Sequence, residues 1–392
     1  MPHITVKPFN TSLVENKRYG DTEVLFKAKD SFSKDELLGV QHKDESFLLH
    51  IKKNKDSWLL KYDKVTRPLK VDLVKQAITD LADGLKLDIL GSNIAIRSTR
   101  EVKSSEFEKR VEDFEDVKFP FDSVAIEVGF GSGKHLLYQA KKHSDRLFIG
   151  IEIHTPSAMQ VLKQIELKGL KNIWVVNYDA RLLLEMIPSN SCHQIFVHFP
   201  VPWDKKPHRR VISSSFLEES MRVLKKGGRL ELRTDSHKYF WYSLETFLGD
   251  SVAKTSVEIR KNEALDVISK YEARWLKQKK DIYDVYVTSL EESKERLINF
   301  DFSFKDIVYK KEILDKISYK PQIFDGFFIH FERLYYILDD AILIKLAFGS
   351  FDRPEHKYIY IDRKEAYYFH TNPVKTVTNY KTHLKIMEYL NA

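Results

Sequence analysis

The chain has 392 residues, of which 43% are hydrophobic and 31% are charged, a composition that indicates a globular protein of two or three domains. Its most apolar stretch, 327–348, is interrupted by charged side chains and falls short of the roughly 20 apolar residues of a membrane-spanning helix. No apolar run follows the first charged residues, and the single cysteine, Cys192, cannot form an internal disulfide. We therefore expect a cytoplasmic protein that binds no membrane and has no metal site.

The formal net charge of +7 is placed unevenly along the chain. Lys and Arg exceed Asp and Glu by 4 in residues 1–100 and by 3 in residues 101–290, whereas residues 291–392 are balanced. A basic excess is compatible with a polyanionic partner such as nucleic acid, but one of this size is also found in proteins that bind none.

Residues 1–105 predict an N-terminal accessory domain of mixed structure. Two alternating runs, 47–52 and 58–62, indicate a hairpin. An amphipathic helix is predicted over Val71–Gly84, because apolar side chains recur there at helical spacing.

Residues 106–290 predict an α/β domain. Short apolar runs rich in β-branched residues alternate with longer segments of helical spacing, a pattern typical of a mostly parallel sheet covered by helices. The segment 225–228, Lys-Lys-Gly-Gly, is expected to end a helix. The predicted strands are 124–128, 147–151, 173–177, 193–198, 229–233, 256–259 and 282–289, and the predicted helices are 134–143, 156–168, 180–186, 213–225 and 238–248.

Residues 291–392 predict a C-terminal accessory domain that is rich in aromatic side chains. This segment holds 20 Phe and Tyr residues and several alternating runs, such as 357–362. The pattern favours a small α+β or β-rich domain whose core contains most of these rings.

A glycine-rich turn follows the first strand of the α/β domain. Gly129, Gly131 and Gly133 alternate with other residues, which lets the backbone turn tightly, and the helix that follows offers free N–H groups to a ligand. The spacing differs from the G-x-G-x-x-G of dinucleotide-binding proteins. Glu127 at the end of the strand would repel a pyrophosphate, but it suits a ligand with a cationic amino-acid group, such as S-adenosylmethionine.

Two further carboxylates follow the next two strands. Glu152 stands where an acid accepts hydrogen bonds from ribose hydroxyls, and Asp179 stands where an acceptor meets the adenine amine, although Asp179 is also a candidate helix N-cap. Because the carboxyl ends of parallel strands line one edge of the sheet, these acids should lie together. We therefore predict S-adenosylmethionine as the cofactor.

The fourth strand is followed by Phe199-Pro-Val-Pro-Trp-Asp-Lys-Lys-Pro-His-Arg-Arg210. Two prolines stiffen this loop, Trp203 offers a stacking face, and the cations that follow suit phosphate groups. The alternative is a solvated basic loop with Trp203 packed on the sheet edge.

Several of these motifs occur together and in a fixed order. They are Glu-x-Gly-x-Gly-x-Gly, Gly150-Ile151-Glu152, Asp179-Ala180, the Phe-Pro-x-Pro-Trp-x-Lys-Lys loop, Thr234-Asp235 and Ser269-Lys-Tyr-Glu-Ala-Arg274. In this combination, residues 120–290 resemble the bacterial tRNA (guanine-N7)-methyltransferases. The segments on either side match nothing that we recognise in the compact members of that family.

The resemblance implies the fold and the activity. The fold would be the Rossmann-like class I fold of S-adenosylmethionine-dependent methyltransferases, with a seven-stranded, mostly parallel sheet and an antiparallel last strand, plus two smaller accessory domains. The activity would be methylation of guanine N7 in tRNA, at position 46 of the variable loop. The partner would be tRNA, and the oligomeric state stays open, with a monomer favoured.

The resemblance also implies site residues. Glu127, Gly129, Gly131, Glu152 and Asp179 would bind the cofactor. The substrate would contact Trp203, Lys205, Asp235, Ser269, Tyr271 and Glu272, of which Asp235 and Glu272 would also be catalytic.

One position departs from the family pattern. Val201 stands where the family has an aspartate in Phe-Pro-Asp-Pro-Trp. Guanine N7 carries a lone pair and no proton, so methylation needs alignment more than a general base, and Asp235 or Glu272 would replace the missing carboxylate. The alternatives are a tRNA-binding module with a weakened methyltransferase fold and a methyltransferase that acts on a small molecule.

Overall fold

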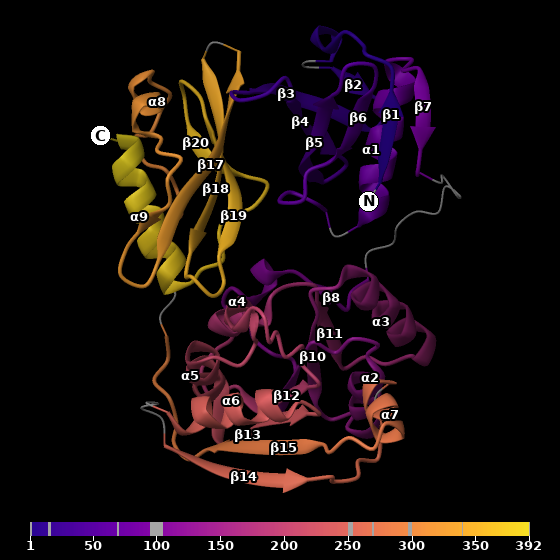
Figure 1. The fold of residues 1–392 in the computed structure, drawn as a ribbon, viewed down its shortest axis with the longest axis vertical. Coiled ribbons are helices and arrows are strands. Elements are labelled where there is room, and N and C mark those ends of the chain that lie inside the picture. The colour runs from indigo at the N-terminus through magenta and orange to yellow at the C-terminus, as the bar shows by residue number, and fades with distance from the viewer. Residues whose placement is uncertain are drawn as a thin grey trace. The chain divides into compact units, whose positions relative to one another are not determined.

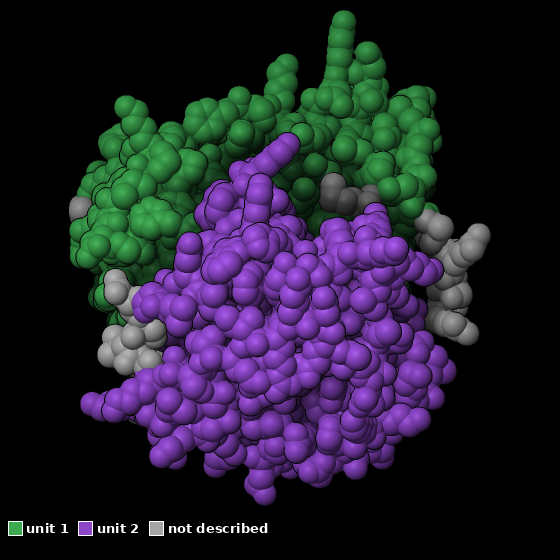
Figure 2. All heavy atoms as spheres, turned by 60° about the horizontal axis from the view of Figure 1, so that its bottom comes forward, with its two compact units in different colours: residues 1–103, 300–373, 377–392 green, residues 104–299, 374–376 purple. Residues whose placement is uncertain are grey.

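The computed structural model describes residues 2–14, 17–68, 70–94, 105–249, 254–268, 270–296, 300–338 and 340–391. The chain divides into two compact units (Figures 1 and 2). The first, unit 1, comprises residues 1–103, 300–373 and 377–392, and the second, unit 2, comprises residues 104–299 and 374–376. None of the helices in the described part of the chain is long and apolar enough to cross a membrane.

Unit 2 contains an eight-stranded sheet. Every described neighbour pair is parallel except those of β15, which is antiparallel to both of its neighbours. The seven predicted strands are all present, and the eighth, β8, has only two residues. The order across the sheet is β14 (Thr255–Lys261), β15 (Tyr283–Ser289), β13 (Leu224–Thr234), β12 (Cys192–His198), β9 (Val124–Val128), β10 (Leu147–Ile151), β11 (Ile173–Val176) and β8 (Glu108–Lys109).

Helices cover both faces of this sheet, which explains why β9 and β10 are buried along their whole length. Ile126 and Ile149 belong to one core with α4, α5 and α6, whereas Ala125 and Phe148 belong to the other with α2 and α3. The helices are α2 (Lys134–Lys142), α3 (Thr155–Lys168), α4 (Ala180–Met186), α5 (Ser214–Val223), α6 (His237–Leu248) and α7 (Lys270–Lys277).

The predicted helix stop at 225–228 is wrong in position. α5 already ends at Val223, because Leu224 has an extended backbone with ψ 135° and begins β13. The two glycines lie inside β13, where Gly227 has φ +83° and the register with β12 shifts. A β-bulge accounts for this glycine as well as a helix end does.

Unit 1 contains a twelve-stranded sheet in its described residues, and all of its pairings are antiparallel. The predicted hairpin and the predicted helix at Val71–Gly84 are confirmed. The main order is β20 (Ala366–Phe369), β19 (Glu355–Ile361), β18 (Ala341–Gly349), β17 (Phe328–Ile337), β3 (Thr22–Asp30), β4 (Glu36–His42), β5 (Glu45–Lys53), β6 (Trp58–Tyr62), β1 (His3–Val6) and β7 (Ile89–Ser92), with β16 (Gln322–Ile323) on β17 and β2 (Arg18–Tyr19) on β3. The helices are α1 (Val71–Gly84), α8 (Glu312–Lys316) and α9 (Val377–Asn391).

The two flanking segments share this sheet, whereas we predicted two separate accessory domains. β3 pairs with β17 through Asp30 and Tyr335, and Arg333 Nη1 donates to Asp30 Oδ2 over 2.9 Å. One core cluster also mixes the two segments, with Phe26 beside Phe369 at 5.3 Å between ring centroids. The apolar stretch 327–348 is largely β17 and β18, two strands of this sheet.

Candidate active site

A cavity of about 640 Å³ lies at the carboxyl edge of the unit 2 sheet. Its lining comes from the ends of β9, β10 and β12, from segments that follow β9 to β13, and from α7. The carboxyl ends of the strands are where open α/β sheets bind ligands. The lining residues that matter below are Gly129, Gly131, Glu152, Asp179, His198, Val201, Trp203, Arg209, Asp235 and Trp275.

The glycine turn forms one wall of this cavity. Gly129, Gly131 and Gly133 have φ values of +70°, +54° and +70°, a region that other L-residues rarely adopt. A Cβ atom added to Gly129 or Gly131 would meet no protein atom within 4 Å, whereas one added to Gly133 would lie 2.3 Å from Val161 Cγ2. The first two glycines therefore leave room for a ligand, and the third lets α2 approach α3.

Glu152 fixes the shape of this turn. Its side chain is buried, and the backbone N–H of Gly131 donates to Oε2 over 2.9 Å while that of His154 donates to Oε1 over 2.9 Å. Each carboxylate oxygen keeps a second lone pair, so Glu152 can also accept from a ligand.

Asp179 is the N-cap of α4, as the alternative interpretation had it, and it also lines the cavity. It accepts from the backbone N–H of Arg181 over 2.9 Å, and the Arg181 guanidinium donates to Oδ2 over 2.7 Å. The cap and the ion pair hold this carboxylate at the cavity wall.

The structure does not bring Glu127 to the cavity. Its side chain is buried on the α2 side of β9, where Oε2 lies 2.8 Å from His135 Nδ1. Burial by itself lowers the pKa of His135, but the Glu127 carboxylate outweighs that effect and raises the pKa above 6.5. This contact joins β9 to the first turn of the helix that follows the glycines.

The proline loop also lines this cavity. Trp203 has φ +45°, and the guanidinium of Arg209 lies 5.2 Å from its ring centroid. The Arg210 Nε–H donates to the Pro202 carbonyl over 2.8 Å, so this hydrogen bond joins the basic C-terminal end of the loop to its proline-containing N-terminal part. Val201 is 59% exposed and lines the cavity, whereas Lys205 is exposed and does not line it.

Two residues that sequence reasoning missed adjoin Asp235. Lys280 Nζ donates to Asp235 Oδ2 over 2.7 Å and lies 3.7 Å from the ring centroid of Trp275. Trp275 belongs to α7 and lines the cavity. Trp275 directly follows the segment 269–274, which resembles a family motif, and this position in the sequence could have indicated a role in the site.

Glu272 does not line this cavity. It is 3% exposed, and the Arg233 guanidinium donates to Oε1 over 2.7 Å and to Asp284 Oδ1 over 2.5 Å. The two carboxylates raise the pKa of Arg233 against the opposing effect of burial. The described backbone places Tyr271 in α7, while its side chain and the whole of Ser269 lie outside the described residues.

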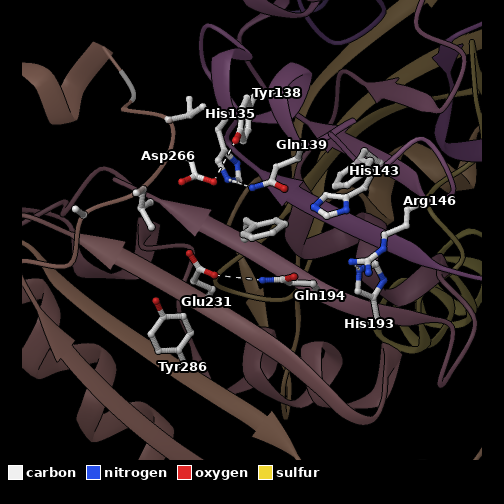
Figure 3. Close-up of a pocket in the computed structure, with 15 residues that line it drawn as sticks. His135, Tyr138, Gln139, His143, Arg146, His193, Gln194, Glu231, Asp266 and Tyr286 are labelled. Atoms are coloured by element: carbon white, nitrogen blue, oxygen red, sulfur yellow. Dashed lines mark hydrogen bonds between the residues drawn. The ribbon is translucent and has the colours of Figure 1, made fainter. Parts of the chain in front are cut away.

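A second, polar cavity of about 280 Å³ lies on the α2 face of the same sheet (Figure 3). Gln194 Nε2 donates to Glu231 Oε2 over 3.2 Å in this cavity, and Glu231 Oε1 also lies 2.8 Å from Nε2 of His198, which lines the first cavity. Despite burial, the hydrogen bond from His198 lowers the pKa of Glu231. Burial and the Arg146 guanidinium lower the pKa of His193 to about 4, so this imidazole is neutral near pH 7.

The strand order, the antiparallel β15 and the glycine turn with carboxylates at one sheet edge define a class I methyltransferase fold. Residues 122–285 match a family model described as "Putative methyltransferase". The chain is 39% identical over 400 residues to a tRNA (guanine-N(7)-)-methyltransferase of Wolinella succinogenes, with 100% of both chains covered. It therefore belongs to the tRNA (guanine-N7-)-methyltransferase family.

Other relatives show the same extent of similarity. An enzyme of that name from Campylobacter fetus is 41% identical over 89% of each chain, and one from Helicobacter acinonychis is 42% identical over 89% of this chain and 86% of its own. Among solved structures, the chain is similar to the 16S rRNA methyltransferase KamB at 16% identity, with a TM-score of 0.35 over 45% of this chain and 92% of that chain. Because the Wolinella relative aligns over its whole length, the flanking segments that we could not place have counterparts within the family.

Proposed function

We propose that this protein transfers a methyl group from S-adenosylmethionine to N7 of a guanine in tRNA. The observation that carries the proposal is that one cavity is lined both by the glycine turn with Glu152 and by the proline loop with Trp203 and Asp235. A donor held by the first group of residues and a base held by the second would share this cavity, and their proximity would supply much of the rate enhancement.

The residues present fit the methyl donor. The open space beside Gly129 and Gly131 is the cradle that a Cβ atom would fill, and Glu152 and Asp179 supply acceptors for hydroxyl and amino groups. When bound, S-adenosylmethionine supplies a methyl group on a sulfonium, whose sulfur keeps the bond's electron pair while the positive charge passes to the guanine ring. Glu127 acts on this site indirectly, through its pair with His135 at the start of α2.

Asp235 is the residue proposed to stabilise the reacting guanine. Guanine N7 attacks the methyl group through a lone pair and loses no proton, so the reaction needs no general base. A fixed negative charge would instead stabilise the positive charge that develops on the guanine ring. The carboxylate of Asp235 lines the cavity and is 16% exposed, so it is partly shielded from water. Val201 supplies only apolar surface on the same cavity, which would exclude water without reading the base.

The remaining predicted substrate residues divide into two roles. Lys205 and its basic neighbours are exposed, so we assign them to the phosphates of tRNA, contacts that position the substrate without reading its sequence. Glu272 is assigned a positioning role, because its ion pair with Arg233 attaches α7, and with it Trp275, to β13.

The test is methyl transfer from labelled S-adenosylmethionine to an unmodified tRNA transcript, followed by nucleoside analysis of the product. We expect 7-methylguanosine in the variable loop and none in a transcript whose variable-loop guanine is replaced by adenine. Tight binding of tRNA and S-adenosylhomocysteine without any transfer would contradict the proposal and would favour the binding-module alternative.

A further inference from the structure

Asp235, Trp275 and Lys280 form a small cation site at the wall of the cavity. The Lys280 ammonium lies 2.7 Å from the Asp235 carboxylate and 3.7 Å from the Trp275 ring centroid, so it contacts both groups at once. Asp235 and Trp275 line the cavity, whereas Lys280 is not among its lining residues. The ammonium therefore engages these two groups without filling the space they face.

A carboxylate next to an indole face binds a positive charge by Coulomb attraction and by the ring quadrupole. The cavity has two other described acidic side chains in its lining, and both are already held, Glu152 by two backbone N–H groups and Asp179 by Arg181. Asp235 is instead paired with the side chain of Lys280, which is 41% exposed. A ligand cation can compete for this carboxylate.

The proposed reaction creates such a cation. Guanine is neutral before the methyl group arrives, and the 7-methylguanine ring carries a positive charge afterwards. An aromatic face and a carboxylate favour the charged ring over the neutral one, so a site built only from these two groups would hold its product more firmly than its substrate.

We propose that Asp235 and Trp275 form a subsite for the positively charged 7-methylguanine and that Lys280 competes with this base and thereby favours its release. The inference rests on the function proposed above. Two cations that share one carboxylate and one ring repel each other, so the ammonium weakens the hold on the charged product and leaves the neutral guanine little affected. Lys280 is then a specificity-determining residue that acts on the charge of the base.

The experiment measures the affinities of 7-methylguanosine and guanosine for the full-length protein by equilibrium dialysis, with S-adenosylhomocysteine present. The pH is mildly acidic, so that the methylated ring keeps its N1 proton and its charge. The quantity compared is the affinity for 7-methylguanosine divided by the affinity for guanosine. It is measured in the wild type and in Lys280→Met, Trp275→Leu and Lys277→Met. The last variant is the matched control, since it removes an exposed lysine of α7.

We expect Lys280→Met to raise the ratio by about threefold to tenfold, because an exposed ion pair and a cation–π contact each correspond to a few-fold change in affinity. Trp275→Leu should lower the ratio, and Lys277→Met should leave it unchanged. An unaltered ratio in Lys280→Met, an equal change for both nucleosides, or no binding of either nucleoside to the wild type would overturn the inference. If wild-type protein methylates tRNA but the ratio does not move, only this inference fails, whereas absence of transfer refutes the proposed function itself.

Discussion

Replacing Gly133 by alanine should destabilise unit 2 through two separate effects. The residue has φ +70°, a conformation that costs an L-residue about 1–2 kcal/mol. The new Cβ would lie 2.3 Å from Cγ2 of Val161, a fully buried side chain of α3, and overpacking of this kind costs about 1–3 kcal/mol. Together the free energy of unfolding should fall by about 2–5 kcal/mol.

Gly131→Ala provides the matched comparison. Its φ of +54° imposes a similar backbone cost, but the added Cβ meets no protein atom within 4 Å. The methyl group would instead point into the space assigned to the methyl donor, since Gly131 lines the cavity. We therefore expect Gly131→Ala to lose cofactor affinity and only the backbone share of the stability, about 1–2 kcal/mol, whereas Gly133→Ala should lose the larger amount of stability.

Scanning calorimetry and titration with S-adenosylhomocysteine separate these outcomes. For a unit of this size each kcal/mol corresponds to about 2–4 °C, so the melting temperature of Gly133→Ala should fall by roughly 4–20 °C. Combining Gly133→Ala with Val161→Ala should recover part of the loss, because the clash is removed. If Gly133→Ala and Gly131→Ala lower the melting temperature equally, the assigned packing role of Gly133 is refuted.

Three further predictions concern other residues of unit 2. Asp235→Ala should lower kcat/KM for tRNA by about tenfold to a hundredfold, and by more than Val201→Ala does; an equal or smaller loss in steady-state assays would defeat the role given to Asp235. Glu272→Ala leaves Arg233 buried with one ion-pair partner fewer, so the free energy of unfolding should fall by about 3–5 kcal/mol, and unchanged thermal unfolding would contradict this. The pKa of His193 is lowered from 6.5 to about 4, so below pH 6.5 this side chain binds a proton in the unfolded chain but not in the folded one. The free energy of unfolding should therefore fall as the pH drops from 6.5 towards 4. Melting temperatures measured across this range should decrease less in His193→Gln than in the wild type.

The α/β core was predictable because its signals are local. Apolar β-branched runs and helical spacing predicted seven of the eight strands and five of the six α-helices that the structure describes in unit 2, with good agreement at Val124–Val128 and Ala180–Met186. The short strand β8 and the helix α7 were not predicted, and β13 begins five residues earlier than expected. The glycine turn and the acids Glu152 and Asp179 were also found, since the ends of parallel strands necessarily share one edge.

The direction of individual side chains was not predictable. Glu127 lies one position before the end of β9, whereas Glu152 directly follows β10. Because side chains alternate along a strand, Val128 lines the cavity and Glu127 points to the α2 face, where it pairs with His135. Glu272 and Asp235 both lie in segments that resemble family motifs, but only Asp235 lines the cavity. Glu272 is buried instead, where it forms an ion pair with Arg233 of β13. Lys280 and Trp275 become relevant only through contacts that the folded chain creates.

Periodicity, turns and strand ends are properties of neighbouring residues, so most elements of unit 2 and the edge of the sheet that carries the site could be predicted from the amino-acid sequence. The pairing that places both ends of the chain in one sheet was not predictable in this way. Asp30 and Arg333 are separated by 303 positions and interact across the pairing of β3 with β17. Strands pair so that their apolar side chains are buried together, as Phe26 and Leu343 are in one core cluster. No local pattern in either segment encodes which distant strand will be its partner.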